Sequence, residues 1–323
     1  MVACVVIRTD IFLAALVLDI AVGDPTWLPH PVQAIGAATA CCDALARDAG
    51  IRERALLGRV AGVFTTLAIV GASYTAATSL LRHAGKARSA LEVTLAASTL
   101  AWRSLMAEAA SVEGALIAGD LVRARERLAR IVGRDTDALH ASEIARATIE
   151  TLAESLCDGI VAPLCYLTIG GAPLALAYKA VNTLDSMIGH IEPPYRAFGW
   201  CAARLDDAAN FVPARLSALA IAAAAQFAGS SSSQSLQVCG RDARLHRSPN
   251  AGWPEAAIAG ALGVRLGGRN SYDGVELQAP LLGAEFRAPV AEDLRRARQL
   301  VSLAAALLAV AALAVLGARD AFR

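Results

Sequence analysis

Charged and aromatic side chains are both scarce in this chain of 323 residues. Asp, Glu, Lys and Arg make up 18% of the residues and aromatic side chains 5%, whereas 56% are hydrophobic. A soluble domain carries roughly 25% charged residues, so this composition disfavours an ordinary soluble domain and excludes a disordered chain. The formal net charge of +1 offers little attraction for nucleic acid, and we expect no such partner. An integral membrane protein is the class that the composition favours.

Several common chemical motifs are missing as well. The seven cysteines form no CxxC pair and the five histidines show no metal-ligand spacing, which argues against a disulfide framework and a zinc site. P-loop, GxSxG and HExxH motifs are also lacking, so a phosphate site would be of a non-standard kind. The apolar run Ile11–Leu18 has the form of a signal peptide, but Asp10 and Asp19 favour an uncleaved first membrane helix.

Apolar segments alternate with polar ones along the chain. They predict an all-α, multi-pass membrane helical bundle that forms a single integral membrane domain over residues 1–323, with amphipathic and cytosolic-side helices in the polar stretches. The segments cover about residues 11–22, 55–81, 89–110, 159–177, 216–228 and 299–318. The last is the cleanest, because about 20 helical residues cross a hydrocarbon core of ~30 Å. A strand is indicated only near Val275–Leu277.

The fourth apolar segment is interrupted at Gly170-Gly171-Ala172-Pro173. Each half is too short to cross a bilayer as a helix, so we predict a broken segment that packs as a hairpin. A hairpin returns the chain to the side it left and would bring Asp158 and Lys179 close together. Irregular backbone at membrane depth has to be covered by protein or to line a water-filled cavity.

A ladder of acidic residues precedes this broken segment. Glu150, Glu154 and Asp158 follow one another at i, i+4 spacing, so they share one face of a predicted helix. Three such acids repel one another unless a cation lies among them, which favours Mg²⁺ or a cationic partner such as Lys179. The alternative is a solvated helix face on which Arg146 pairs with Glu150.

Asp206 and Asp207 form a second acidic group. Asn210 follows Asp206 at i, i+4 spacing, which places a carboxylate and an amide on one helix face. Carboxylate and amide oxygens are suitable ligands for a divalent metal or a nucleotide–Mg²⁺ complex. The alternative is a helix cap with a salt bridge to Arg204.

Directly after the broken segment, Lys179, Asn182 and Asp185 lie within two helical turns. Polar groups that follow an apolar hairpin are costly to bury unless they are used. A lysine among carboxylates is suited to a substrate that carries phosphate. The alternative is the capped end of a helix.

A proline-rich loop follows the first apolar segment. Three prolines at positions 25, 29 and 31 prevent a helix and stiffen the loop, so it can hold Asp24 and His30 in place. The alternative is a turn at the membrane surface that Trp27 anchors in the interface.

A second rigid loop, Ser248–Pro254, leads into a predicted helix that begins at Glu255. Ser248 and Asn250 lie where backbone N–H groups of a helix N-terminus favour an anion, and Trp253 stands in the same loop. A glycine-rich turn that contains Asn270 follows the helix. We therefore interpret this region as a phosphate or substrate site.

Six longer motifs in the chain resemble one family when they are taken together. They are Gly133–Thr136, Ala147–Glu154, Tyr178–Met187, Phe198–Trp200, Arg204–Asp207 and Ser248–Ala256. The chain is similar in these motifs to the adenosylcobinamide-phosphate synthase family of cobalamin biosynthesis, the CobD/CbiB type, from about Asp19 to Gly283.

This resemblance implies a carbon–nitrogen ligase, a multi-pass enzyme of the bacterial cytoplasmic (inner) membrane. The implied reaction joins adenosylcobyric acid, a corrinoid, to aminopropanol or aminopropanol phosphate, with ATP and Mg²⁺ as cofactors. The implied partners are the corrinoid, the amino alcohol phosphate, the lipid bilayer and other membrane enzymes of cobalamin assembly.

Together with that chemistry, the motifs suggest roles for individual residues. We expect catalytic roles for Glu150, Glu154, Asp158, Lys179 and Asp185. We expect substrate or phosphate binding by Asp24, His30, Asn182, Arg204, Asn210, Ser248, Asn250, Trp253, Glu255 and Asn270. We expect Asp206 and Asp207 to bind the metal.

Two other classes of protein stay open at this point. AmpE-like membrane proteins share the general architecture and are thought to act in sensing or signalling, but a sensor has no need of Lys179, Asp206 and Asn250 together. A transporter of small solutes would favour inverted repeats with a broken helix in each half, and only one broken segment is visible.

Overall fold

The computed structural model describes residues 6–24, 30–190 and 194–322. Most of these residues are helical, and within them the only strands form one antiparallel hairpin. The chain divides into two compact units. The first unit comprises Met1–Ala101, Ala162–Asn210 and Ala311–Arg323, and the second comprises Trp102–Val161 and Phe211–Val310.

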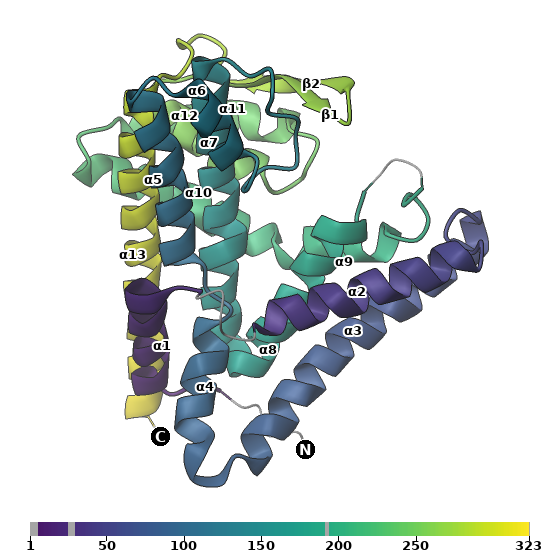
Figure 1. Ribbon diagram of the computed structural model, residues 1–323. Coiled ribbons are helices and arrows are strands. Elements are labelled where there is room, and N and C mark those ends of the chain that lie inside the picture. The colour runs from purple at the N-terminus through teal and green to yellow at the C-terminus, as the bar shows by residue number, and fades with distance from the viewer. Residues whose placement is uncertain (1–5, 25–29, 191–193, 323) are drawn as a thin grey trace. The chain divides into compact units, whose positions relative to one another are not determined.

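The first unit is entirely helical in its described part (Figure 1). Its helices are α1 (Thr9–Val22), α2 (Pro31–Asp48), α3 (Ala55–His83), η1 (Gly85–Ala87), α4 (Arg88–Ala97), α8 (Ala162–Ile188) and α9 (Trp200–Ala209). The core between α2, α3 and α8 is apolar and includes Ile35, Ile69, Leu184 and Phe198. Gly62 of α3 lies against the Phe198 carbonyl, where a Cβ atom would collide with the backbone.

The second unit contains the helices α5 (Trp102–Ile117), α6 (Leu121–Leu128), α7 (Ala141–Leu156), η2 (Cys157–Val161), α10 (Phe211–Phe227), α11 (Ser232–Asp242), η3 (Ala243–Leu245) and α12 (Gly252–Leu262). It also holds the strands β1 (Leu266–Tyr272) and β2 (Val275–Leu282) and the first two thirds of α13 (Ala291–Ala321). Helix α12 is apolar except for Glu255, and all of its residues except Trp253 are buried, as expected for a central helix. It packs against α7, α10 and α11.

Three stretches are long and apolar enough to cross a membrane: α3, the run Ala141–Ile188 and α13. A fourth is obtained when α9 and α10 are taken together. The multi-pass helical fold is therefore confirmed, but three of the six apolar segments are not spans of their own. The segment 216–228, in α10, belongs to a candidate span only together with α9. Helix α1 has only 14 residues, fewer than the ~20 needed. The segment 89–110 is divided between two helices, because α4 ends at Ala97 and α5 begins at Trp102. The single domain over 1–323 stays a prediction.

Helix α8 is broken where the sequence predicts a break. Gly170 has φ −141° and ψ 17°, and Gly171 has φ 66° and ψ −166°, so neither is helical. The positive φ of Gly171 is a conformation that residues with a Cβ rarely adopt. Pro173 then begins the second half, where its missing N–H costs nothing. The break therefore divides α8 into two parts, and the first part continues α7 and η2 without a gap, so it is not the short helix that the sequence predicts.

The β1–β2 hairpin is more extensive than the short strand predicted near Val275. Its strands pair from Tyr272↔Val275 to Leu266↔Leu282, with an irregularity between Leu266 and Gly268. Asp273 and Gly274 both have positive φ, as the tightest hairpin turns require. The glycine-rich turn predicted after α12 is thus strand β1, which lies in Figure 1 at the same end of its unit as α6 and α12.

Candidate functional site

Glu150 is the centre of a buried charged cluster in the second unit. Its Oε2 lies 2.7 Å from Nη2 of Arg134, and its Oε1 accepts hydrogen bonds from Nη1 of Arg146 at 3.0 Å and from the Gly267 N–H at 2.8 Å. All three charged side chains are nearly inaccessible, with exposed fractions of 6 to 12%. One carboxylate thus bridges two guanidinium groups, which leaves the cluster with one excess positive charge.

Asn270 joins strand β1 to the same cluster. Its Oδ1 accepts hydrogen bonds from Arg134 Nη1 at 2.7 Å and from Arg146 Nη2 at 3.0 Å. Arg146 also donates to the Arg269 carbonyl at 2.8 Å. The predicted site residues Glu150 and Asn270, which are 120 positions apart in the sequence, therefore contact the same two arginines.

Asp135 holds the tip of the hairpin next to this cluster. Its carboxylate accepts hydrogen bonds from Ser271 Oγ at 2.6 Å and from the N–H groups of Asp273 at 3.1 Å and Gly274 at 2.9 Å. The bonds from Ser271 and Gly274 lower the pKa of Asp135, since they favour its charged form. The residue before it, Arg134, is thereby positioned opposite Asn270.

Glu255 lies in the first turn of α12 and is only 6% exposed. Burial raises the pKa of Glu255 well above its ordinary value, and the charges of Glu150 and Glu154 raise it further. His246 Nε2 lies 3.9 Å from its Oε1, and His246 Nδ1 accepts the Ser248 N–H at 3.0 Å. Burial therefore favours the protonated form of Glu255, which can donate a hydrogen bond inside the fold.

The predicted loop Ser248–Pro254 is ordered by its own side chains. Ser248 Oγ accepts the N–H groups of Asn250 and Ala251, both at 3.2 Å. Asn250 Oδ1 accepts a hydrogen bond from Nη1 of Arg215 at 3.0 Å. The Arg215 guanidinium also lies 4.6 Å from the centre of the Trp253 ring. Helix α12 begins at Gly252, three residues before the predicted start.

Asp206 is the centre of a different cluster, in the first unit. Asn210 Nδ2 donates to Asp206 Oδ2 at 3.0 Å, and Tyr178 donates its hydroxyl to Asn210 Oδ1 at 2.9 Å. The amide of Asn182 also bonds to Asp206, and the Lys179 charge lies close enough to interact with it. The contact predicted from the i, i+4 spacing of Asp206 and Asn210 is confirmed.

The remaining predicted residues of the first unit lie around helices α8, α9 and the loop before α2. Lys179 Nζ donates to Asn182 Oδ1 at 3.4 Å, and Asp185 is half-buried one turn further on. Arg204 donates a hydrogen bond to Asp207 Oδ2 at 2.9 Å. This is the salt bridge to Arg204 that the alternative interpretation of the motif predicted. Asp207 thus has a different charged partner from Asp206. Asp24 Oδ1 lies 3.2 Å from His30 Nε2, so these two predicted residues do meet, although the prolines at 25 and 29 lie outside the described residues.

The three acids of the ladder do not share one environment. Glu150 is buried, Glu154 is exposed and Asp158 is half-buried. Asp158 falls in η2, a π-helical turn of five residues, which shifts it off the i, i+4 row. The carboxylate repulsion expected from spacing alone is therefore relieved by the two arginines and by this change of helix type.

The described residues contain no group of three or more His, Cys, Asp and Glu side chains that could hold a metal ion. Mg²⁺ commonly takes only one or two protein carboxylates and completes its shell with substrate phosphates and water. Asp206, with its amide neighbours, is suited to a Mg²⁺ site that has few protein ligands. A metal-binding role for Asp206 and Asp207 stays a prediction.

Three functional candidates are absent from the sequence-based set: Arg134, Arg146 and Arg215. From the sequence, Arg146 is expected only to pair with Glu150, and Arg134 only lies within the motif Gly133–Thr136. Arg215 carries no spacing signal, because its partner Asn250 is 35 residues away. Arg134 precedes Asp135, which binds the hairpin turn. The Asp-Gly pair at 273–274, which is typical of a hairpin turn, is the one local signal that could have pointed to Arg134.

A family model described as CobD/Cbib protein matches residues 12–301 of the chain. The chain is 44% identical over 297 residues to a cobalamin biosynthesis protein CobD from Klebsiella pneumoniae, covering 91% of this chain and 92% of the relative. It is 47% identical over 277 residues to a CobD from Geobacter metallireducens, covering 84% and 86%. A cobalamin biosynthesis protein CbiB from Salmonella typhimurium is 43% identical over 297 residues, with 91% and 92% covered. No solved structure matches the chain.

Proposed function

The chain belongs to the CobD/CbiB family and takes part in cobalamin biosynthesis, and we propose that it acts there as a carbon–nitrogen ligase. The proposed substrates are adenosylcobyric acid and aminopropanol or its phosphate, and the proposed product is adenosylcobinamide or its phosphate. ATP supplies the driving force. The proposal rests on the buried arginine cluster around Glu150, because an acid that is activated by a nucleotide requires a fixed site for anionic groups.

The proposed reaction has two steps. A corrinoid carboxylate oxygen attacks the γ-phosphorus of ATP, and the bond from that phosphorus to the bridging oxygen breaks, which yields an acyl phosphate and ADP. The amine nitrogen then bonds to the acyl carbon, the carbon–oxygen bond to phosphate breaks, and the amine gives up a proton to a base. Negative charge develops on oxygen in both steps, so fixed cations lower both barriers.

Arg134 and Arg146 are the proposed anion-binding groups of the second unit. Both guanidiniums are buried, share Glu150 and are held by Asn270, so they need no rearrangement to accept a carboxylate or phosphate oxygen. Glu255 adds a buried carboxyl group, and its protonated form, which burial favours, can donate a hydrogen bond to an anionic group. The exposed Glu154 is the proposed base for the amine proton.

Asp206 is the proposed Mg²⁺ ligand of the first unit. Its carboxylate is hydrogen-bonded by the amides of Asn210 and Asn182. These amides carry no charge, so a bound cation would stabilise the ionised form of this carboxylate. Mg²⁺ would neutralise charge on a nucleotide phosphate when bound, and Lys179 would bind a phosphate oxygen beside it.

The proposed location is the cytoplasmic membrane of a bacterium, where the apolar helices α3 and α13 lie in the lipid. Exposed leucines and valines on these helices, such as Leu67 and Val310, suit a lipid environment. Association with other membrane enzymes of cobalamin assembly is proposed as well, since product and later intermediates share the large corrinoid.

The corrinoids of a strain that lacks this gene test the proposal. We expect cobyric acid to accumulate and added cobinamide to restore cobalamin synthesis. The wild-type gene and a Glu276→Gln control on the exposed hairpin should complement the strain, whereas Asp206→Asn should not. Normal cobalamin levels in the strain, or no rescue by cobinamide, would contradict the assigned step.

A further inference from the structure

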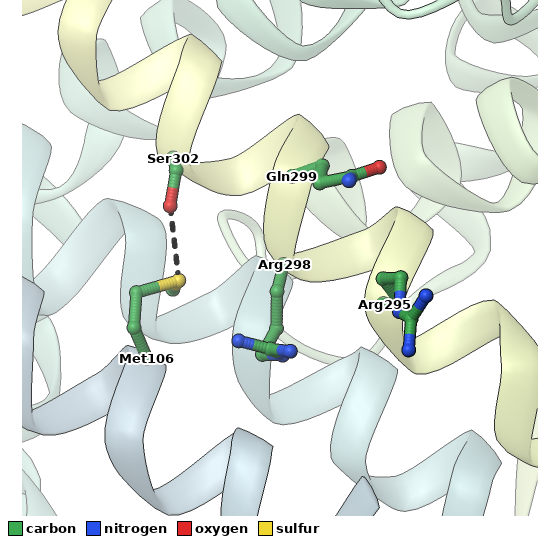
Figure 2. A pocket seen from close by; sticks show the side chains of 5 residues that line it. All are labelled: Met106, Arg295, Arg298, Gln299 and Ser302. Atoms are coloured by element: carbon green, nitrogen blue, oxygen red, sulfur yellow. Dashed lines mark hydrogen bonds between the residues drawn. The ribbon is translucent and has the colours of Figure 1, made fainter.

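A cavity of about 440 Å³ lies beside the polar beginning of α13, and none of the predicted site residues lines it. Its walls are formed by Met106 of α5 and by Arg295, Arg298, Gln299 and Ser302 of α13 (Figure 2). Ser302 donates its hydroxyl to the sulfur of Met106 at 3.1 Å. This volume is in the range of small-molecule sites.

The two arginines of this cavity share a single counter-charge. Glu113 of α5 is buried, and its Oε2 accepts hydrogen bonds from Nε and Nη2 of Arg298 at 2.9 and 2.6 Å. Nε of Arg295 lies 3.5 Å from the other oxygen, and the Arg295 side chain is 68% exposed. The nearby acid Asp293 is paired with Arg287 and Arg296 instead. The charges of Arg295, Arg298 and Glu113 therefore sum to one positive charge, and Arg295 is the more exposed of the two arginines.

The cavity lies at the boundary between the polar and apolar parts of α13. The helix is charged from Glu292 to Arg298 and has no charged residue from Leu300 to Ala318, where it is a candidate membrane span. Arg295, Gln299 and Ser302 lie at i, i+4 and i+7, and the same helix face continues to Ala306 and to Val310, which is 65% exposed. An apolar stripe thus runs directly from the charged cavity into the membrane part of the helix.

We propose that this cavity binds the phosphate of an anionic phospholipid, and that an acyl chain of the lipid lies along the stripe from Ser302 to Val310. The excess positive charge attracts an anionic headgroup, as basic pockets beside membrane helices do. A soluble anion would meet the same charge but would leave the apolar stripe uncovered, so the stripe favours the lipid. The inference does not depend on the ligase reaction.

Lipid retention by the full chain in detergent tests this proposal. Native mass spectrometry and thermal unfolding are recorded with phosphatidylglycerol, with phosphatidylcholine and with glycerol 3-phosphate. We expect phosphatidylglycerol to be retained and to raise the Tm, while the other two have little effect. Equal retention of phosphatidylcholine would overturn the requirement for an anionic headgroup, and an equal shift with glycerol 3-phosphate would overturn the requirement for a lipid.

Arg295→Gln is the test variant, because the exposed side chain of Arg295 can be replaced without disturbing the bonds between Arg298 and Glu113. The loss of one arginine should weaken phosphatidylglycerol binding about fivefold. Arg296→Gln is the matched control, since Arg296 is one residue away but lies near Asp293 and Ser230. Unchanged binding in Arg295→Gln, or an equal loss in both variants, would overturn the assignment of the site. The Tm of each variant without lipid verifies that it is folded.

Discussion

Two carboxylates of this protein, Glu150 and Asp206, have different kinds of partner. Glu150 in the second unit contacts two arginines and a backbone N–H, whereas Asp206 in the first unit is hydrogen-bonded by amides. A carboxylate that is shared by two guanidiniums holds both of them in place. A carboxylate held by uncharged amides would be stabilised in its ionised form by a bound cation. Residue type alone therefore does not assign the role of an acid.

The largest effect on stability is expected from Glu150→Gln. The substitution leaves two buried guanidiniums without their carboxylate, which should cost about 3–5 kcal/mol of unfolding free energy. Thermal and denaturant unfolding of the purified protein in detergent measure it. Glu276→Gln is the control, since the exposed ion pair of Glu276 with Arg269 contributes about 0–1 kcal/mol. Similar losses in both variants would contradict the bridging role of Glu150.

Asp206→Asn should affect turnover much more than stability. Asparagine can retain one amide contact, so we expect a loss of less than about 1 kcal/mol in stability but a decrease of about a hundredfold or more in turnover, because the proposed Mg²⁺ ligand is lost. Asp207→Asn should cost less turnover, since Asp207 pairs with Arg204. Rates of product formation and unfolding curves for both variants separate the two contributions, and a wild-type rate in Asp206→Asn would remove it from the site.

Glu255 should make stability depend on pH. Its pKa is raised in the folded protein, so the fold binds a proton that the unfolded chain releases near pH 4.5. This contribution is complete below that pH and is lost as the pH rises through the raised pKa, by up to about 1.4 kcal/mol per pH unit. Glutamine does not ionise, so the Tm of Glu255→Gln should fall less than that of the wild type between pH 5 and 8. Parallel curves would mean that Glu255 is ionised in the fold.

The smallest effect is expected for Asp135→Ala, which removes three hydrogen bonds from the hairpin tip. Hydrogen exchange should accelerate at the amides of Asp273 and Gly274 and remain unchanged in α7. Asp137→Ala, an exposed change two residues away, is the control. If exchange at the hairpin tip is the same in both variants, Asp135 does not hold the strands in place.

Much of the helical organisation could be predicted because it depends on local patterns. The break at Gly170 and Gly171 follows from their lack of a Cβ and from the proline that comes next, and the contact between Asp206 and Asn210 follows from helical spacing. These features involve residues that are only a few positions apart.

The surroundings of Glu150 could not be predicted in the same way. Its partner Gly267 is 117 residues away in the sequence, and strand β1 contains Gly267, Gly268 and Asn270, which are poor strand formers. The hairpin forms because Asp273 and Gly274 make a tight turn and Asp135 binds it. A contact between an acid ladder and a distant hairpin leaves no periodic signal in either segment.

The central claim, an ATP-driven ligation, is tested most directly by the reaction of the purified full chain. The protein in detergent is incubated with adenosylcobyric acid, aminopropanol phosphate, ATP and Mg²⁺, and the corrinoids and nucleotides are separated by chromatography. We predict adenosylcobinamide phosphate and ADP in equal amounts, and no product when ATP is omitted. If folded protein yields no amide product with either aminopropanol or its phosphate, the ligase assignment is contradicted.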